Sequence, residues 1–433
     1  MSHKQPKRYT LRELGLSSDR LDRHAISITD RLVKAGFQAY LVGGCVRDAL
    51  LGMHPKDFDV STNAEPEEIQ ALFKNCRLIG RRFRLAHIHF GRHVIEVATF
   101  RGPHIKHDSN KSHAHKDGRL LRDNVYGTLE EDAWRRDFTV NALYLDAQNL
   151  TVIDYVGGID DHQRRTIKLM GDPVTRFKED PVRLLRAVRF KAKLGFQLDS
   201  DTEAPMRELA PLLADIPSAR LYDEVLKLFL NTHASEVFED LRHYGLFEAL
   251  FPQAELCLQK AKTDQPLGLV RQAMTNTAAR LNNKQHITPY FLLATILWEP
   301  VRRLTEKNRG SFSSDTQAIH AAAHEVIAHQ VGRVAIPKRM TTPMREVWAL
   351  QPRFHKQVGV RCLRFLEHPR FRAAYDFMLL RSQYGEVDPS IAEWWTHIQT
   401  LDSAEQKLMT RPTQFKNKRK PRKKPTKAKP AAD

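Results

Sequence analysis

Hydrophobic and polar positions follow two different spacings along the chain. A short apolar run at residues 39–42 stops at Gly43 and Gly44, which is typical of a buried strand that enters a tight turn. Three further strand-like runs, separated by turn residues, lie within residues 76–100. From residue 199 to about residue 403, amphipathic windows at helical spacing replace them. The pattern therefore predicts an α+β fold, with a mixed head followed by an all-helical neck and body.

Breaks in these spacings indicate where the parts of the chain begin and end. The first helical stripe begins near residue 25 and ends at Gly36, so the residues before it are expected to precede the head. We expect a basic, poorly ordered lead-in at residues 1–24, a head at 25–156, a helical neck at 157–215, a helical body at 216–405 and a disordered basic tail at 406–433.

Composition and targeting signals narrow the classes of protein that fit. The chain has 433 residues, enough for several domains with cores of their own. No apolar run approaches the roughly 20 residues that span a bilayer, and the N-terminus lacks the apolar core of a signal peptide. The four cysteines have no paired spacing, which favours reduced thiols over disulfides or a zinc site. We therefore expect a cytoplasmic protein with no membrane-spanning segment.

The charge of the chain indicates a polyanionic partner. The formal net charge is +18, and residues 411–433 contribute ten Lys or Arg against one Asp. This tail holds four prolines and one aromatic residue, so it has too few apolar groups to pack a core. A tail that only solvates the protein is the alternative. Attraction to RNA is favoured because each phosphate contact releases a counterion.

Asp57 and Asp59 are the strongest candidates for catalysis. They lie two apart in a β-prone segment, so both carboxylates are expected to point to one face of a sheet. Adjacent carboxylates suit Mg²⁺, and two such ions are typical of phosphoryl or nucleotidyl transfer. Upstream, Gly43 and Gly44 can let backbone N–H groups approach a phosphate, and Arg47 can bind its oxygens. Together these residues predict a metal-dependent site for a nucleoside triphosphate.

Glu96 is a possible third carboxylate. It alternates with Ile95 and Val97 in a strand-like run, so it is expected to face away from the apolar side. If that strand neighbours the one that carries Asp57 and Asp59, Glu96 can help to hold metal. If it does not, Glu96 is an exposed strand acid. The sequence leaves both interpretations open.

The Gly43-Gly44 turn, Arg47-Asp48 and Asp57-Phe58-Asp59 together resemble the signature of the polymerase-β-like nucleotidyltransferases. More narrowly, they resemble the tRNA nucleotidyltransferase/poly(A) polymerase family. The segment RRDFTVNALY, which begins at residue 135, is similar to the second motif of that family. This resemblance implies that Arg135 and Arg136 meet the nucleotide and that Asp137 completes the catalytic carboxylates.

Residues 179–194 form the second informative stretch. Arg183, Arg186 and Arg189 recur at a spacing of three beside an apolar stripe, so they form a basic strip on a predicted helix. A solvated helix face is the ordinary explanation. However, E-D-x-x-R is similar to the family's nucleotide-selecting motif, which implies that Asp180 and Arg183 bind the base edge in place of a template. The resemblance assigns the basic strip to nucleotide binding in the neck.

Three features resemble the poly(A) polymerase branch of the family rather than its CCA-adding branch. They are the segments LIGRRFRLAHIHFG and HPRFRAAYDFMLLR and the basic tail. The function implied is template-independent addition of AMP from ATP to RNA 3′ ends, in mRNA processing and decay. The cofactors implied are two Mg²⁺ ions held by Asp57 and Asp59, with ATP as substrate, and the helical body is expected to bind RNA. The alternatives are a CCA-adding tRNA nucleotidyltransferase and a non-catalytic RNA-binding protein, and the intact carboxylates disfavour the latter.

Overall fold

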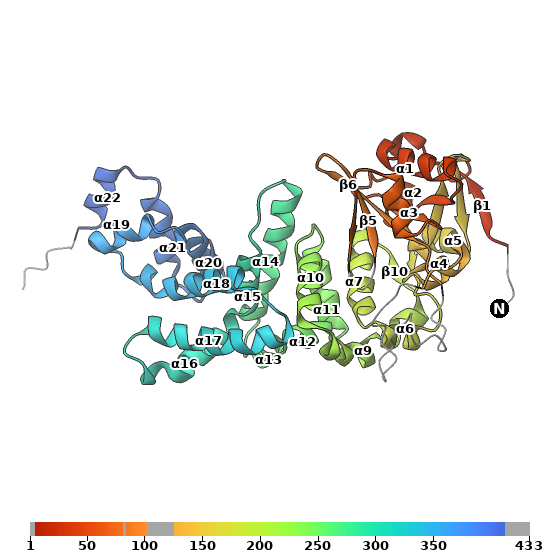
Figure 1. Ribbon diagram of the computed structural model, residues 1–433. Helices are drawn as coiled ribbons and strands as arrows, with labels where there is room; N and C mark the ends of the chain where they lie inside the picture. The colour runs from red at the N-terminus through yellow and green to blue at the C-terminus, as the bar shows by residue number, and fades with distance from the viewer. Residues whose placement is uncertain (1–4, 81–83, 103–124, 412–433) are drawn as a thin grey trace, which may run out of the picture.

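The computed structural model describes residues 5–80, 84–102 and 125–411 (Figure 1). A mixed sheet with its helices lies at one end, and the rest of the described chain is helical apart from one short two-stranded sheet. The predicted α+β class, a nucleotidyltransferase-like head followed by a helical neck and body, is confirmed. None of the helices in the described ranges is long and apolar enough to cross a membrane.

The head is built on an eight-stranded sheet. Strands β3 and β6 are parallel, and the other neighbouring strands described in this sheet are antiparallel. In spatial order the strands are β1 Lys7–Thr10, β8 Thr151–Asp154, β7 Leu143–Asp146, β2 Ala39–Val42, β3 Asp59–Thr62, β6 His93–Thr99, β5 Leu85–Phe90 and β4 Cys76–Ile79.

The two faces of this sheet are covered to different extents. Helices α1 (Arg23–Lys34), α2 (Gly44–Leu50) and α3 (Pro66–Leu72) pack on one face, where the apolar side chains of every second strand residue form the core of the head. On the other face, α4 (Leu129–Arg135) covers Val42, Tyr144 and Ile153. The same face carries Asp59 and Glu96 farther along the sheet, and both are exposed. Among the described residues, α1–α4 leave free the part of this face formed by β3, β6 and β5, which we call the uncovered half. The candidate site lies there.

The N-terminal lead-in is part of the head, which corrects our prediction for residues 1–24. Residues 7–10 form the edge strand β1 and pair with β8. Leu11, Leu16 and Leu21 are buried in the head core. The expectation was wrong because a short, basic segment gains its order from a strand more than 140 positions away, which local spacing does not reveal. Residues 1–4 lie outside the described ranges.

Local sequence features set the ends of helices in the head and neck. Thr128 and Glu131 form the capping box that begins α4. The helix expected at residues 179–194 is divided instead: α6 (Pro173–Glu179) ends before Asp180, and α7 (Val182–Leu194) begins after Pro181. Proline disfavours helical backbone in the residue before it, and this separates the two helices. Asp180 therefore lies at a joint rather than inside a helix.

The remaining elements form the neck and body. They are α5 Gly158–Gln163, β9 Thr166–Ile167, β10 Gln197–Leu198, α8 Ser200–Glu203, α9 Met206–Leu209, α10 Ser218–Phe229, α11 Ala234–His243, α12 Leu246–Leu250, α13 Pro252–Gln259, α14 Gln265–Asn282, α15 Pro289–Ile296, α16 Trp298–Asn308, α17 Asp315–Arg333, α18 Lys338–Leu350, α19 Val360–Leu366, α20 Phe371–Gln383, α21 Pro389–Ile398 and α22 Ser403–Met409.

One hydrophobic core runs through the neck and most of the body, from Phe138 to Leu380. The packing therefore shows no break at residue 215, where the sequence suggested a boundary. A second core around Phe354, Phe365 and Trp395 lies in the last helices. The ordered chain also extends past residue 406, because α22 ends at Met409 and the carbonyl of Thr410 accepts a hydrogen bond from Gly359. The rest of the predicted tail lies outside the described ranges.

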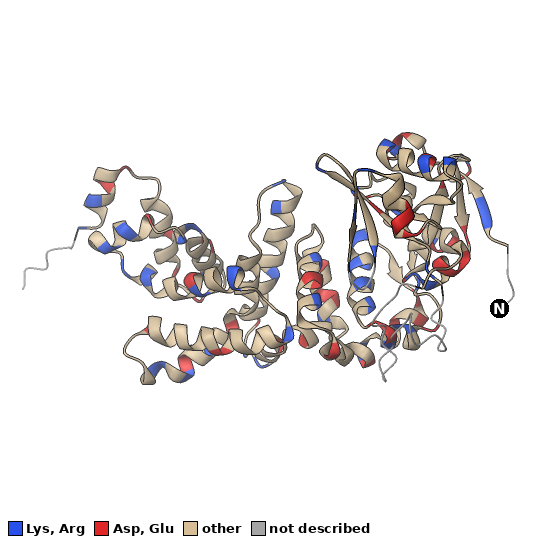
Figure 2. Ribbon diagram, in the orientation of Figure 1, with Lys and Arg blue, Asp and Glu red and all other residues tan. Residues whose placement is uncertain are grey.

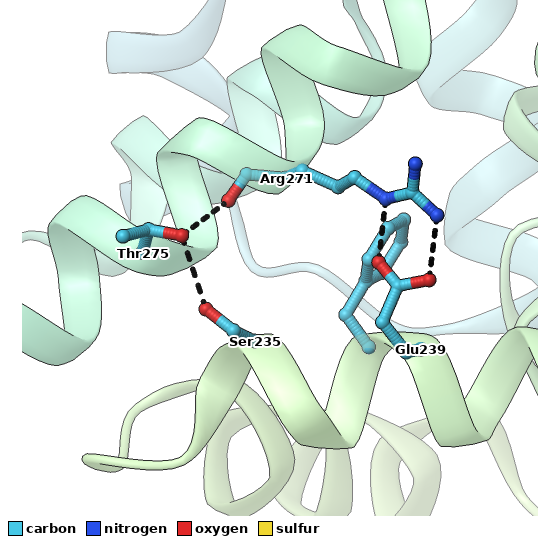
Figure 3. A pocket seen from close by; sticks show the side chains of 5 residues that line it. Ser235, Glu239, Arg271 and Thr275 are labelled. Atoms are coloured by element: carbon cyan, nitrogen blue, oxygen red, sulfur yellow. Dashed lines mark hydrogen bonds and ion pairs between the residues drawn. The ribbon is translucent and has the colours of Figure 1, made fainter.

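Figure 3 shows a shallow recess where α11 meets α14 in the body. Arg271 donates two hydrogen bonds to Glu239, at 2.6 and 2.7 Å, and Ser235 contacts Thr275. About half of each charged side chain is exposed. These polar groups satisfy one another, and none of them belongs to a motif of the predicted site.

The four cysteines are free, as predicted.

Candidate active site

A row of polar side chains crosses the uncovered half of the sheet. In the strand register, Asp59 of β3 lies beside Glu96 of β6, Glu96 beside His87 of β5, and His87 beside Arg77 of β4. Side chains at paired positions point to the same face of a sheet. Ile95, next to Glu96, is fully buried on the opposite face. The strand that carries Glu96 therefore neighbours the Asp59 strand, which was the condition set for a third carboxylate.

The acids at this position lack full charge compensation. Desolvation by the surrounding protein raises the pKa of Asp59 to about 6, and the neighbouring carboxylates of Glu96 and Asp57 add to the increase, while Arg136 opposes it. Asp57 and Asp59 are both exposed to solvent. A bound cation would be favourable where neighbouring carboxylates raise the pKa of Asp59 in this way.

The donor set fits Mg²⁺ rather than zinc. Carboxylate oxygens are the ligands that Mg²⁺ prefers, and it usually keeps several waters and binds substrate phosphates at the same time. Within the described ranges, no group of three or more His, Cys, Asp or Glu side chains is placed so that it could hold a metal ion. The carboxylates thus fit an ion whose coordination is completed by water and substrate.

Arg136 is held beside the carboxylates by a buried network. Its Nε donates to the hydroxyl of Tyr144 at 2.9 Å, and its Nη2 donates to Asp132 at 3.1 Å. The Tyr144 hydroxyl in turn donates to Asp132 at 2.6 Å. The remaining nitrogen, Nη1, would lie 3.4 Å from a Cβ placed on Gly43. Arg136 therefore adjoins both the glycine turn and Asp59, which agrees with its predicted role at the nucleotide.

Gly43 serves the turn rather than a phosphate. Its backbone, at φ 77° and ψ −123°, lies in a region that residues with a side chain rarely adopt. Its N–H donates to the carbonyl of Leu143 at 3.2 Å, so this group is already bonded. Our expectation that the Gly43 N–H approaches a phosphate is corrected by this bond. Gly44 begins α2, and its phosphate contact stays a prediction.

Arg47 is a buried cation held by protein partners, so its predicted phosphate contact would require these partners to change and stays a prediction. Only 2% of its surface is exposed. Its Nε donates to Asp48 at 2.8 Å, its Nη1 donates to the side-chain oxygen of Asn141, and its guanidinium lies 5.0 Å from the ring centroid of Phe190. Burying a guanidinium costs free energy unless it is paired, and these partners satisfy it. Arg47 thus joins the head to the neck helix α7.

Asp137 faces the neck instead of the other acids. Its carboxylate accepts hydrogen bonds from Arg186 Nε at 2.7 Å and from Asn141 Nδ2 at 3.0 Å. Burial alone would raise the pKa of Asp137, but Arg186 and these hydrogen bonds outweigh burial and hold the pKa well below its usual range. The structure does not bring Asp137 to Asp59, whose acidic neighbours are Glu96 and Asp57. The implied assignment of Asp137 to the catalytic carboxylates therefore has no support in this geometry.

These contacts form a continuous polar connection between head and neck. It runs from Arg47 through Asn141 and Asp137 to Arg186, and Lys193 of α7 also binds Asp48 at 2.8 Å. Sequence reasoning missed Asn141, because its partners Arg47 and Asp137 come together only in the fold. In the structure a short 3₁₀ turn at Thr139–Asn141 precedes β7 and places Asn141 between Arg47 and Asp137. Its place inside the second motif was the available signal.

The predicted base-binding pair is engaged within the protein. Asp180 accepts a hydrogen bond from Arg220 of α10 at 2.7 Å. Arg183 is buried and donates to the carbonyl of Arg176 at 2.6 Å and to Glu179 at 3.1 Å. Figure 2 shows basic positions along α7 and acidic positions on the neighbouring α10. Binding of a base by Asp180 and Arg183 stays a prediction, and it would require these partners to change.

Two further arginines, Arg176 and Arg189, lie near the same joint. Arg176 of α6 donates to the backbone carbonyls of Arg135 and Arg136, at 2.8 and 2.7 Å, so the neck holds the end of α4 in place. Arg189 lies one turn beyond Arg186, and its Nε is buried with no hydrogen-bond partner among the described residues. Desolvation, together with repulsion from Arg186, lowers the pKa of Arg189. The predicted contacts of Arg135, Arg186 and Arg189 with a nucleotide stay predictions.

Family models match three parts of the chain. Residues 39–168 match the "Poly A polymerase head domain", residues 195–258 match the "Probable RNA and SrmB-binding site of polymerase A", and residues 312–429 match the "Polymerase A arginine-rich C-terminus". The matched ranges cover the sheet, the neck and the distal helices. They therefore extend well beyond the catalytic motifs.

Relatives and solved structures agree with these models. Poly(A) polymerase I of Salmonella typhimurium is 44% identical over 91% of this chain and 86% of its own length. Poly(A) polymerase I of Haemophilus influenzae is 45% identical over 95% of this chain and 92% of its own. A CC-adding tRNA nucleotidyltransferase of Halalkalibacterium halodurans is 37% identical, but over only 53% of this chain and 54% of its own length.

Among solved structures, an apo CCA-adding enzyme shares the fold with a TM-score of 0.63 at 20% identity, covering 91% of this chain and 88% of that one. A tRNA nucleotidyltransferase complexed with a primer tRNA and an incoming ATP analogue gives a TM-score of 0.59 at 23% identity, covering 86% and 98%. The sequence match distinguishes the two branches, because the poly(A) polymerases match nearly the whole chain and the CC-adding enzyme about half. The chain therefore belongs to the poly(A) polymerase family of nucleotidyltransferases.

Proposed function

We propose that this protein is a template-independent poly(A) polymerase that transfers AMP from ATP to RNA 3′ ends, in mRNA processing and decay. The observation that carries the proposal is the acidic group of Asp57, Asp59 and Glu96 on the uncovered sheet face, in a chain that matches poly(A) polymerases over nine-tenths of its length. In the reaction, a bond forms between the RNA 3′-oxygen and the α-phosphorus of ATP. The bond to the bridging oxygen breaks, pyrophosphate leaves, and the hydroxyl proton passes to solvent.

The carboxylates are the residues that would hold metal. We infer that Asp57 and Asp59 bind two Mg²⁺ ions, with Glu96 beside them as a third acidic group. When bound, such ions activate the 3′-hydroxyl and stabilise the charge of the leaving pyrophosphate, each effect being worth several kcal/mol of barrier. Arg136, anchored by Tyr144 and Asp132, would bind the triphosphate next to Gly43.

The joint between α6 and α7 is proposed to select the nucleotide. Asp180 offers an acceptor and Arg183 a donor, and both belong to the motif that resembles the family's base-selecting segment. In the present geometry each is bound to a protein partner, so nucleotide binding would exchange Arg220 and Glu179 for the base edge. A pocket built to hydrogen-bond one base rejects another because its buried polar groups would be left unpaired.

A single-nucleotide extension assay tests this proposal. With an RNA primer that lacks a tRNA shape, ATP alone should give a long product, at a rate at least about 100-fold higher than CTP alone. Arg183→Ala should reduce this ratio and slow the reaction. A variant at an exposed arginine of the distal helices, Arg372→Ala, serves as the control and should keep the ratio. A product that stops after two C and one A, made only on tRNA-like ends, would identify a CCA-adding enzyme instead.

The basic tail is proposed to strengthen RNA binding. Deleting residues 411–433 removes ten positive side chains and one negative, half of the net charge, but none of the nucleotide motifs. RNA affinity should fall and depend less steeply on salt, because each lost phosphate contact removes about 0.7 from the slope of log affinity against log salt. Binding measured from 50 to 300 mM KCl, roughly the range over which such contacts are screened, checks this. An unchanged slope would contradict an RNA-binding tail, and ATP affinity should not change.

The state of the cysteines bears on the cellular location. All four are free thiols, and three of them are buried. Disulfides are rare in reducing compartments, where buried thiols persist without oxidation. We therefore infer that the protein acts in the cytoplasm.

A further inference from the structure

His87 has an unexplained position next to the carboxylates. It lies on β5, directly beside Glu96 in the strand register, and its Nε2 is 3.2 Å from Glu96 Oε1. One fifth of the His87 side chain is exposed, against one half of Glu96. Glu96 therefore lies between His87 and Asp59 on the sheet. His87 was not among the site residues predicted from the sequence.

The imidazole lacks a satisfied partner of its own. Although the distance to Glu96 is short, the contact is not aligned as a hydrogen bond, and Nε2 is buried without a partner among the described residues. An unsatisfied buried polar atom costs about 1–3 kcal/mol, so such atoms usually mark a functional or adjustable contact. The ring centroid of His89 lies 6.3 Å from that of His87, and this ring offers no carboxylate.

We propose that His87 is a positioning residue that holds the Glu96 carboxylate beside Asp59, so that Glu96 helps to bind the divalent cation. The inference rests on the proposed metal-dependent function. Groups that hydrogen-bond a metal-binding carboxylate fix its orientation, and removing one typically weakens metal affinity by about 10- to 100-fold. Without His87, the half-exposed Glu96 side chain would be free to turn into solvent, and the loss of orientation would weaken cation binding.

Manganese binding to the full, nucleotide-free chain gives a direct readout. Free Mn²⁺ can be measured by electron paramagnetic resonance during titration of the wild type, His87→Ala and His87→Gln. We expect His87→Ala to bind Mn²⁺ about 10-fold more weakly. Glutamine keeps an N–H donor at a similar reach from the backbone, so His87→Gln should recover most of that affinity. His89→Ala, on the same strand and face, should bind as the wild type does.

Two further measurements separate positioning from general damage. Combining His87→Ala with Glu96→Gln should add little to the loss from Glu96→Gln alone, because both changes remove the same contribution. The Mg²⁺ concentration for half-maximal extension should rise by the same factor as the Mn²⁺ dissociation constant, while KM for the RNA primer stays unchanged.

The outcomes distinguish this inference from the proposed function. If Asp59→Asn loses Mn²⁺ binding while His87→Ala keeps it, the role of His87 is overturned and the metal site stands. If His87→Gln fails to recover affinity, or if the losses from His87→Ala and Glu96→Gln are additive, the positioning role is likewise overturned. If Asp59→Asn binds Mn²⁺ as tightly as the wild type, the proposed metal site fails and this inference fails with it.

Discussion

Asp59→Asn is expected to lower the rate of AMP addition at least about 1000-fold, which corresponds to roughly 4 kcal/mol of barrier. The change removes a carboxylate from the proposed metal site and leaves a side chain of the same size. Asp57→Asn should cause a loss of the same order. The measurement is single-turnover extension of an RNA primer with saturating ATP and Mg²⁺, with Glu248→Gln, an exposed acid on α12, as the matched control.

The same substitution should not destabilise the metal-free protein. The pKa of Asp59 is about 6 in the folded state, above the value of roughly 3.9 for an unfolded aspartate. The folded protein therefore favours the protonated form, and the contribution of Asp59 to stability declines as pH rises from about 4 through 6. At pH 8 and without divalent ions, Asp59→Asn should unfold at an equal or higher urea concentration than the wild type.

Magnesium should reverse that order. Mg²⁺ would stabilise the wild type through its carboxylates and have less effect on Asp59→Asn, because binding to the folded state alone increases stability. Urea unfolding at pH 5 and pH 8, with and without Mg²⁺, gives the full comparison. Extension by Asp59→Asn at the wild-type rate, or equal stabilisation of both proteins by Mg²⁺, would rule out the metal assignment.

Asp137→Asn is expected to lower the free energy of unfolding by about 3 kcal/mol. The substitution leaves the partly buried guanidinium of Arg186 without its charge partner at the contact between head and neck. Since the pKa of Asp137 is held well below its usual range, the stability that it contributes is present at neutral pH and is lost in acid, as pH falls below about 4. Urea unfolding at pH 7 measures the loss.

The exposed pair shown in Figure 3 provides the control for this prediction. Arg271 and Glu239 form an equally short, two-bond contact, but each is about half exposed, so Glu239→Gln should cost less than about 1 kcal/mol. The double variant Asp137→Asn with Arg186→Gln should be less destabilised than the sum of its single changes. Equal effects at the two pairs would contradict the structural role of Asp137. Loss of Mn²⁺ binding in Asp137→Asn, as in Asp59→Asn, would instead support the implied place of Asp137 among the catalytic carboxylates.

Strand and turn patterns were enough to predict the framework of the site. The apolar run at β2, the glycine turn and the alternation around Glu96 each reflect the spacing of side chains on a sheet, which a linear pattern records directly. From the sequence, the pairing of β3 with β6 could only be stated as a condition under which Glu96 would join Asp57 and Asp59. It depends on which strands meet, and the chain passes through α3, β4 and β5 between them.

The partners of individual charged residues could not be predicted in the same way. Arg47 is satisfied by Asn141, 94 positions later, and Asp137 by Arg186, 49 positions later. A motif shows which residues gather at a site, but burial and pairing decide whether a guanidinium faces a substrate or a protein carboxylate. The structure retains Arg136 next to the glycine turn and assigns Arg47 and Asp137 to the contact between head and neck.

The most direct test of the proposed catalytic site is extension of an unstructured RNA by the wild type and Asp59→Asn, each supplied with ATP labelled at the α-phosphate. We expect the wild type to add a long labelled run of adenosines and to release pyrophosphate, while Asp59→Asn adds none under the same conditions. A wild type that binds the RNA but never extends it would indicate a non-catalytic RNA-binding protein. Equal extension by both proteins would show that the acidic group on the uncovered sheet face is not where the chemistry occurs.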